Sequence, residues 1–169
     1  MKRYLVRVKD FFVYDCRYGI KNLIQWFPLV WQNRDYDHYF IYTALRHKLD
    51  LTEKHIREHD IHTRAKEDAD RIKTCVLLLD RLIEDVYHEM AFKEHDKRWG
   101  RPELNWEDID EPEDCVELHI THKHVHTKED KEKETKDFRR ASTHEANLRK
   151  QDKELLFNTL KKHIDSWWD

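Results

Sequence analysis

The clearest pattern of apolar and polar positions lies in residues 64–99. Apolar side chains recur there at alternating spacings of four and three residues, at Ala65, Ala69, Ile72, Val76, Leu79, Ile83, Val86 and Met90. This is the heptad seam of a helix that packs on another helix at a shallow angle. Gly100 and Pro102 then end the pattern. We predict one continuous helix over 64–99, at the centre of a helical bundle.

Two further segments show helical spacing. In residues 35–58 the stripe consists of Ile41, Leu45, Leu49, Thr52 and Ile56, and Asn33 or Asp35 is expected to cap the helix. A shorter stripe occupies residues 20–27, and we expect Pro28 to kink or end that helix.

The sequence of residues 127–169 predicts a long helix, with a charged first part and an apolar stripe at its far end. Residues 128–137 are nearly all charged, so we expect this part to project into solvent. The far end carries apolar residues in register, which should pack back on the bundle: Leu156, Leu160, Ile164 and Trp167.

A single strand is predicted near residues 115–125. Val116, Leu118 and Ile120 alternate with polar residues, which is typical of a half-buried strand. Because residues 101–114 look acidic and irregular, its partner is expected from residues 4–8 or from another subunit. This strand and the heptad seam together predict self-association.

These elements predict a mainly α protein, a helical bundle with a small β element. We expect a single domain, 1–169, in four parts: a basic aromatic head (1–34), a two-helix core (35–100), an acidic loop with a histidine-rich strand (101–126) and a charged C-terminal helix (127–169). Only 2 Gly and 3 Pro among 169 residues, with 40% charged residues, also favour long helices over a sandwich or barrel.

Composition limits the cellular compartment and the binding partners that we expect for this protein. The three cysteines are odd in number and form no CxxC pair, and no apolar run is long enough to span a bilayer. We therefore expect a cytoplasmic protein without a disulfide framework. Residues 1–34 carry a net charge of +5 within a chain of net charge −3. That head offers charge and aromatic rings to nucleic acid or to an anionic membrane, but the overall acidity favours neither partner.

Histidines supply the first candidate chemistry. His122, His124 and His126 would share one face of an extended strand, where they could bind a metal ion; the alternative is an exposed strand end. His55 and His59 fit an H-x-x-E-H zinc pattern, but solvated histidines at a frayed helix end are the favoured interpretation.

Acidic residues supply the second. His95-Asp96, with neighbouring acids, would suit a metal-dependent nucleotide phosphohydrolase, but the His-Asp pair is as frequent here as chance predicts. The chain has no glycine-rich phosphate loop and no G-x-S-x-G elbow. We therefore predict no catalytic residue and no cofactor.

A small-molecule pocket is expected around the start of the second helix. Its members would be Trp31, Arg34, Asp35, Asp37 and Lys48. Arg and Lys would meet phosphate, Trp would stack on a base, and the acids would accept hydrogen bonds. Helix capping and packing account for the same residues without a ligand.

One pattern resembles a known group. Trp26-Phe27-Pro28 with Trp31 precedes Arg34-Asp35-Tyr36-Asp37, and a leucine-rich helix precedes Glu94-His95-Asp96-Lys97-Arg98-Trp99-Gly100. Over about residues 20–100 the chain resembles a family of small tailed-bacteriophage proteins. The resemblance implies action in an infected bacterial cell or in a virion, and it carries over no activity.

The functional expectation follows from these points. We expect a non-enzymatic phage accessory binding protein, a homo-oligomer in the host cytoplasm, that sequesters a host-defence protein or a small nucleotide signal. The alternatives are a metal-dependent nucleotide phosphohydrolase and a structural virion component.

Overall fold

The computed structural model describes residues 14–33, 37–60, 63–108 and 116–167. Along these ranges run α2 (Cys16–Gln32), α3 (His38–His59), α4 (Ala65–Glu84), α5 (Tyr87–Trp99), β1 (Pro102–Asp108), β2 (Val116–His122), α6 (Lys128–His163) and the short 3-10 helix η2 (Ile164–Ser166). The predicted class, mainly α with a small β element, is confirmed.

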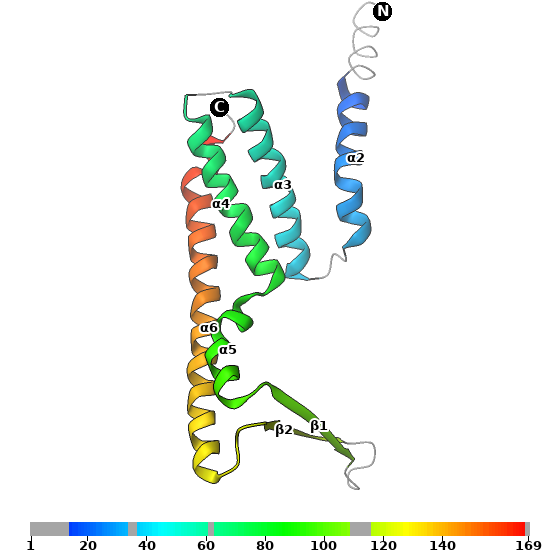
Figure 1. Cartoon of the computed structure of the whole chain (residues 1–169). Helices are drawn as coiled ribbons and strands as arrows, with labels where there is room; N and C mark the ends of the chain where they lie inside the picture. Colours follow the sequence, from blue (N-terminus) through cyan, green and yellow to red (C-terminus); the bar gives the residue numbers. More distant parts are fainter. Residues whose placement is uncertain (1–13, 34–36, 61–62, 109–115, 168–169) are drawn as a thin grey trace, which may run out of the picture.

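The molecule is elongated and has two ends (Figure 1). We call α3, α4, η2 and the C-terminal half of α6 the core half. Its interior is apolar and includes Leu49, Ile56, Ala69, Ile72, Leu79, Leu156, Leu160 and Trp167. We call α5, β1, β2 and the N-terminal half of α6 the hairpin half. The helix α6 is the element common to both.

The prediction of a single continuous helix over 64–99 is wrong. It is divided into α4 and α5, and Asp85 between them takes the left-handed conformation with φ 51°. An aspartate tolerates this backbone better than most residues, and Arg149 of α6 donates to its carboxylate at 2.6 Å. The seam is accordingly buried at Leu79 but half exposed at Met90. The break lets α5 leave α4 and follow α6.

The helix α3 confirms the prediction for residues 35–58, with a different cap. The Asp37 carboxylate accepts a hydrogen bond from the backbone N–H of Phe40 at 3.2 Å. Asp35, one of the two predicted caps, lies outside the described residues. Of the predicted stripe, Leu49, Thr52 and Ile56 are buried, whereas Ile41 remains exposed.

The helix α2 runs through Pro28, so the prediction that it ends there is wrong. Proline removes one backbone donor, but the helix continues for another turn. Asn33 closes that last turn, since both its backbone N–H and its side-chain amide donate to the Leu29 carbonyl, at 3.2 and 2.8 Å.

The strand near 115–125 is confirmed as β2, with a partner that differs from both predicted ones. It pairs antiparallel with β1, with Leu104 opposite Ile120 and Trp106 opposite Leu118. The prediction of irregular structure is therefore wrong for residues 102–108, and residues 4–8 lie outside the described ones. Val116, Leu118 and Ile120 are exposed rather than half-buried, because no other element covers their face of the hairpin in the described structure.

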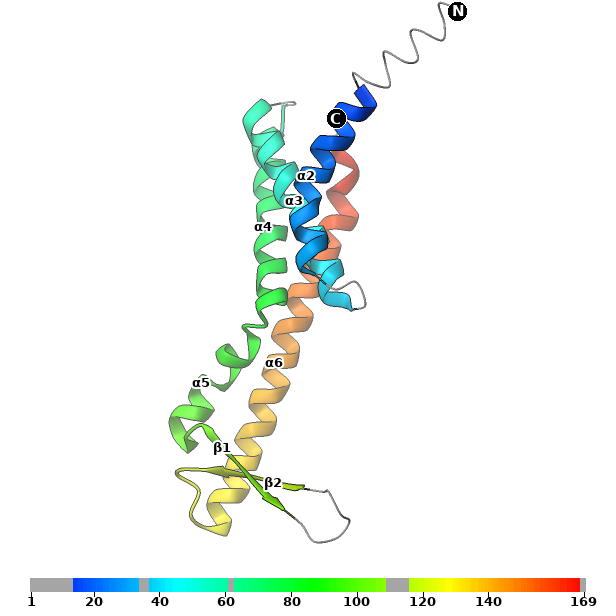
Figure 2. The same cartoon turned by 90° about the vertical axis from the view of Figure 1, so that its right-hand side faces the viewer.

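The helix α6 confirms one of its two predictions. At its far end Leu156, Leu160 and Trp167 are buried, whereas Ile164 is exposed. The prediction that residues 128–137 project into solvent holds for one side only: six of these ten residues are exposed, whereas Glu134 and Asp137 face α5 and the end of β2 (Figures 1 and 2). No helix among those described is both long and apolar enough to cross a bilayer.

Candidate metal centre

Three elements of the hairpin half bring two histidines and a glutamate together. His95 comes from α5, His122 ends β2, and Glu134 lies near the start of α6. The Nε2 atoms of His95 and His122 are 3.2 and 3.4 Å from the same Glu134 oxygen, Oε1. The side chains are 3%, 10% and 13% exposed, so the cluster is largely shielded from water. It is the one group of this kind found among the described residues.

The junction between α5 and the hairpin positions His122. Gly100 ends α5 with φ 86°, a conformation that side chains rarely adopt, and a Cβ there would lie 3.0 Å from Lys123 Cβ. The returning chain is bonded to this end of α5, because the His124 N–H donates to the Trp99 carbonyl at 3.1 Å. The imidazoles of His122 and His95 are thereby set edge to face, 5.3 Å between centroids.

The start of α6 is fixed on both sides of Glu134. Thr127 and Asp130 form a capping box, in which the threonine hydroxyl accepts from the Asp130 N–H and the carboxylate accepts from the Thr127 N–H, each at 3.0 Å. The Thr127 hydroxyl also donates to the Asp130 carboxylate at 2.7 Å, and this bond, together with the one from the Thr127 N–H, holds the pKa of Asp130 below its usual range. One turn after Glu134, the Asp137 carboxylate accepts from the Trp99 indole at 3.1 Å.

The outer nitrogens of the two imidazoles also face oxygen. His122 Nδ1 is 3.1 Å from the Gly100 carbonyl, and His95 Nδ1 is 3.2 Å from Asp96 Oδ1. A neutral imidazole has one N–H, so it can donate on one side only. With Nδ1–H donating outward, each Nε2 lone pair points at Glu134, and only a cation between them makes that arrangement attractive. Outward Nδ1–H bonds to a carboxylate or a carbonyl are typical of metal-binding histidines.

The distances fit a small tetrahedral ion. Two ligand atoms each about 2.05 Å from a tetrahedral zinc ion are about 3.3 Å apart. The distances from the two Nε2 atoms to Glu134 Oε1 already have this length, and all three ligand atoms lie within 4.8 Å of one another. The distance between the ligand nitrogens of the two imidazoles therefore has to shorten by at most about 1.5 Å, which side-chain rotation can supply.

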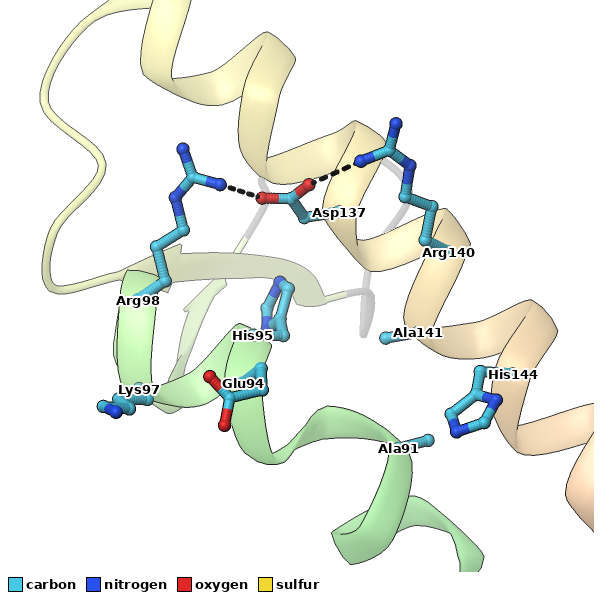
Figure 3. A pocket seen from close by; sticks show the side chains of 9 residues that line it. All are labelled: Ala91, Glu94, His95, Lys97, Arg98, Asp137, Arg140, Ala141 and His144. Atoms are coloured by element: carbon cyan, nitrogen blue, oxygen red, sulfur yellow. Dashed lines mark hydrogen bonds and ion pairs between the residues drawn. The ribbon is translucent and has the colours of Figure 1, made fainter.

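An open groove of ≈ 610 Å³ runs along α5 and α6 beside this cluster, and His95 is one of its lining residues (Figure 3). Across it, Asp137 lies between two arginines and pairs with Arg98 at 2.8 Å and with Arg140 at 3.6 Å. Lys97 and His144 also line the groove. This groove brings basic side chains close to one ligand of the candidate metal centre.

Of the three histidines predicted to bind metal, only His122 lies in this cluster, and His124 and His126 lie outside it. The strand ends at His122, so the alternation that would align His124 and His126 with it stops there. His124 Nδ1 instead lies 3.1 Å from the Arg98 carbonyl, and His126 is exposed. His95 and Asp96, considered for a phosphohydrolase, supply a candidate ligand and its outer hydrogen-bond partner. The exposed His55 and His59 rings stack 4.4 Å apart, away from this cluster.

The described members of the predicted small-molecule pocket do not line one cavity. Arg34 and Asp35 lie outside the described residues. Trp31 is 77% exposed on α2 and stacks on Phe27, and Asp37 caps α3. Lys48 lines a pocket between α2 and α3 that includes neither Trp31 nor Asp37.

Glu134 is the site residue that sequence reasoning missed. It was grouped with the solvated charges of residues 128–137. The signal that marks it is its spacing, since it stands seven residues before Ala141 and fourteen before Leu148, on the seam of α6 that faces the rest of the molecule.

No protein-family model, no curated protein and no solved structure matches the chain. The case for this site therefore depends on its geometry, and the resemblance to phage proteins stays a prediction.

Proposed function

We propose that the chain is a non-enzymatic binding protein whose hairpin half is held by a divalent transition-metal ion at His95, His122 and Glu134. Zinc is the best fit, because it accepts imidazole and carboxylate ligands in tetrahedral geometry. The observation that carries the proposal is the convergence of two Nε2 atoms on one carboxylate oxygen while both outer nitrogens face other oxygens.

The ion would connect elements that apolar packing does not hold. None of the described side chains of β1 and β2 is buried, so the hairpin adds nothing to the apolar core. One ligand from each of α5, β2 and α6 would fix the hairpin relative to both helices. Because the unfolded chain does not assemble such a site, the free energy of metal binding would add to folding stability.

The burial of the ligands favours this structural role over catalysis, since a substrate would have to displace the shielding side chains. One observation favours the alternative of a metal-dependent nucleotide phosphohydrolase. Three protein ligands leave a tetrahedral ion one open position, as in catalytic zinc sites, and basic residues line the adjacent groove. The zinc-loaded protein should leave a nucleotide panel unchanged if the role is structural, and phosphate release would support the hydrolase instead.

The biological setting that we propose is an accessory role in an infected bacterial cell, in which the chain binds a host-defence protein. The similarity of residues 20–100 to phage proteins supports this setting. A virion component is the rival, and mass spectrometry of purified virions separates the two, because an accessory protein should be missing from the particles.

Zinc titration of the metal-depleted protein tests the metal site. Calorimetry should give one ion per chain for the wild type. His122→Ala and Glu134→Gln should each weaken binding at least tenfold, because each removes or weakens one of three ligands. His126→Ala is the matched control, since it removes a nearby exposed histidine. It should bind as the wild type does.

Two results would contradict the site. Equal loss in His126→Ala would place the ion on the histidines after the strand. Absence of binding by the wild type would leave the cluster as two imidazoles hydrogen-bonded to Glu134.

A further inference from the structure

The helix α2 exposes an apolar face that nothing in the described structure covers. Whereas Tyr18 lies on the other side, six of its seven exposed large apolar side chains recur at helical spacing and fall on about one third of the helix circumference: Ile20 (57%), Leu23 (70%), Ile24 (69%), Phe27 (59%), Val30 (60%) and Trp31 (77%). We call these six residues the α2 face. On the opposite side of the helix, Leu29 is buried and the Trp26 ring meets His47 of α3 edge to face at 5.0 Å. The helix is thus apolar on its inner and its outer side, which is unusual for a surface helix facing water.

The hairpin exposes a second apolar face. The pairing register puts Leu104, Trp106, Val116, Leu118 and Ile120 on one side of the two strands, and they are 40–63% exposed. We call these five residues the hairpin face. The other side of the hairpin is polar, with His119 between Glu107 and Glu117 at 3.5 and 3.6 Å. An alternation this regular is typical of a sheet with one covered side.

The two faces cannot cover each other within one chain. The helix α2 lies beside the core half, and the hairpin lies at the far end of the molecule (Figure 1). Both, however, project from the same side of the long body formed by α4, α5 and α6. Figure 2 views the molecule from that side, with α2 above and the hairpin below. A second copy turned end over end therefore brings its hairpin to α2 and its α2 to the hairpin.

Charge favours this pairing over contact between like faces. The helix α2 contains Arg17 and Lys21 and no acidic residue. The two strands contain four acids and no lysine or arginine. The pairing register puts three of these acids, Glu103, Glu107 and Glu117, on the polar side of the hairpin, behind the hairpin face. Two copies of α2 brought together would place basic helices side by side, and two hairpins would place acidic strands side by side. Only the unlike pairing brings a basic helix to an acidic hairpin.

We propose that two copies of this chain form a two-fold dimer in which the α2 face of each copy packs on the hairpin face of the other. A two-fold dimer makes this contact twice, which helps it to reach the roughly 1,200–2,000 Å² that stable interfaces bury. His122 follows Ile120 on the same side of the hairpin, but the two substituted positions, Ile24 and Trp106, lie outside the metal cluster. Zinc titration and sedimentation therefore test the metal site and the dimer separately.

Sedimentation velocity of the full chain tests the dimer. The wild type should sediment as a dimer. Ile24→Glu on the α2 face and Trp106→Glu on the hairpin face should each weaken association at least tenfold, because each puts a charge into both contacts. Leu77→Glu is the matched control, since Leu77 is an exposed apolar residue of α4 outside both faces (53%). It should dimerise as the wild type does, and circular dichroism checks that all variants fold.

Mixing identifies which surfaces meet. Ile24→Glu keeps an intact hairpin face and Trp106→Glu keeps an intact α2 face, so an equimolar mixture should form a mixed dimer that neither variant forms alone.

Other outcomes overturn the proposal. A monomeric wild type excludes the dimer. A wild-type dimer that Trp106→Glu leaves intact and Ile24→Glu dissolves means that α2 pairs with α2. Failure of the mixture to associate, when the wild type is dimeric, excludes the reciprocal contact. Binding of a monomeric wild type to anionic phosphatidylserine vesicles, lost in Ile24→Glu, would assign the α2 face to a lipid surface instead.

Discussion

The core half and the hairpin half are held together by different chemistry, although both use the same helix. In the core half, α6 contributes Leu156 and Leu160 to an apolar interior. In the hairpin half, the same side of α6 contributes Glu134 and Asp137, which meet imidazole, indole and guanidinium groups. Apolar packing is non-directional and needs nothing from the solvent, whereas polar contacts need correct geometry, protonation or an ion. The hairpin half should therefore respond to solution conditions that leave the core half unchanged.

The largest effect is expected from a cavity in the core half. Leu79 on α4 is fully buried. Leu79→Ala should lower the free energy of unfolding by about 2–5 kcal/mol, through lost transfer energy and the cavity left behind. Urea denaturation followed by circular dichroism measures it. Leu77→Ala, at an exposed position on the same helix, is the control and should cost far less. Equal losses would mean that the core half is not the main source of stability.

Zinc should act on the other half. At a free concentration one hundred times its Kd, the ion should stabilise the folded state by about 2.7 kcal/mol, close to a hundredfold. Amide hydrogen exchange should slow most in α5, the hairpin and the first turns of α6. Amides of α3 and α4 should change little where they open independently of the hairpin half. Uniform slowing across the chain would show that the two halves unfold as one cooperative unit.

The junction between the halves offers a smaller effect with a pH signature. The hydroxyl of the buried Tyr87 donates to Asp152 at 2.8 Å, and Arg81 pairs with the same carboxylate at 3.2 Å. Tyr87→Phe should cost about 1–2 kcal/mol, because Asp152 keeps one of its partners.

Burial, with the bond to Asp152, raises the pKa of Tyr87 well above its ordinary value of 10.0. The protonated phenol is thus favoured in the folded state. Its contribution is fully present below pH 10 and is lost as the pH rises further. Urea midpoints from pH 8 to 11 should fall more steeply in the wild type than in Tyr87→Phe. Tyr39→Phe, at an exposed position, is the control and should follow the wild type. Parallel curves for all three proteins would contradict the assignment.

The smallest effect is expected at the start of α6. Thr127→Ala removes the hydroxyl of the capping box and should cost about 1 kcal/mol. Because the hydrogen bonds of the capping box lower the pKa of Asp130, the stabilisation is present above the ordinary carboxyl pKa of 3.8 and is lost as the pH falls below it. The difference between the two proteins in urea should therefore shrink in acid. Thr143→Ala, in the middle of α6, provides the comparison, and a difference that grows in acid would exclude the capping box as its cause.

The core half could be predicted well from the sequence, because the helix faces that pack together there consist of apolar residues. Leu49 and Ile56 of α3, Ile72 and Leu79 of α4, and Leu156 and Leu160 of α6 recur at helical spacing, and all are buried. The hairpin half was harder to predict, because its elements meet through polar side chains. Helical periodicity is recognised from apolar residues, so it does not mark such contacts. The strand β1 has only Leu104 and Trp106 as large apolar residues, so it looked irregular. The break at Asp85 changes one backbone conformation and leaves the apolar spacing intact, so the pattern could not reveal it.

The candidate site was predicted only in pieces. His95 and His122 were each singled out, but for two unrelated hypotheses, because 27 positions separate them in the chain. Only the turn at Gly100 and the pairing of β1 with β2 bring them together. Glu134 was missed because a glutamate among many charged neighbours has no local mark, and its role comes from what the fold places opposite it.

The shared seam of α6 makes the phase of this helix a constraint on the length of the chain. The helix has 36 residues, about 54 Å, and it presents Glu134 and Leu156 on nearly the same side. One residue inserted between them would rotate one end relative to the other by about 100°, so that either Glu134 or Leu156 would turn towards water. Seven residues would nearly restore the register. Natural or engineered length variants should therefore differ here in steps of two helical turns.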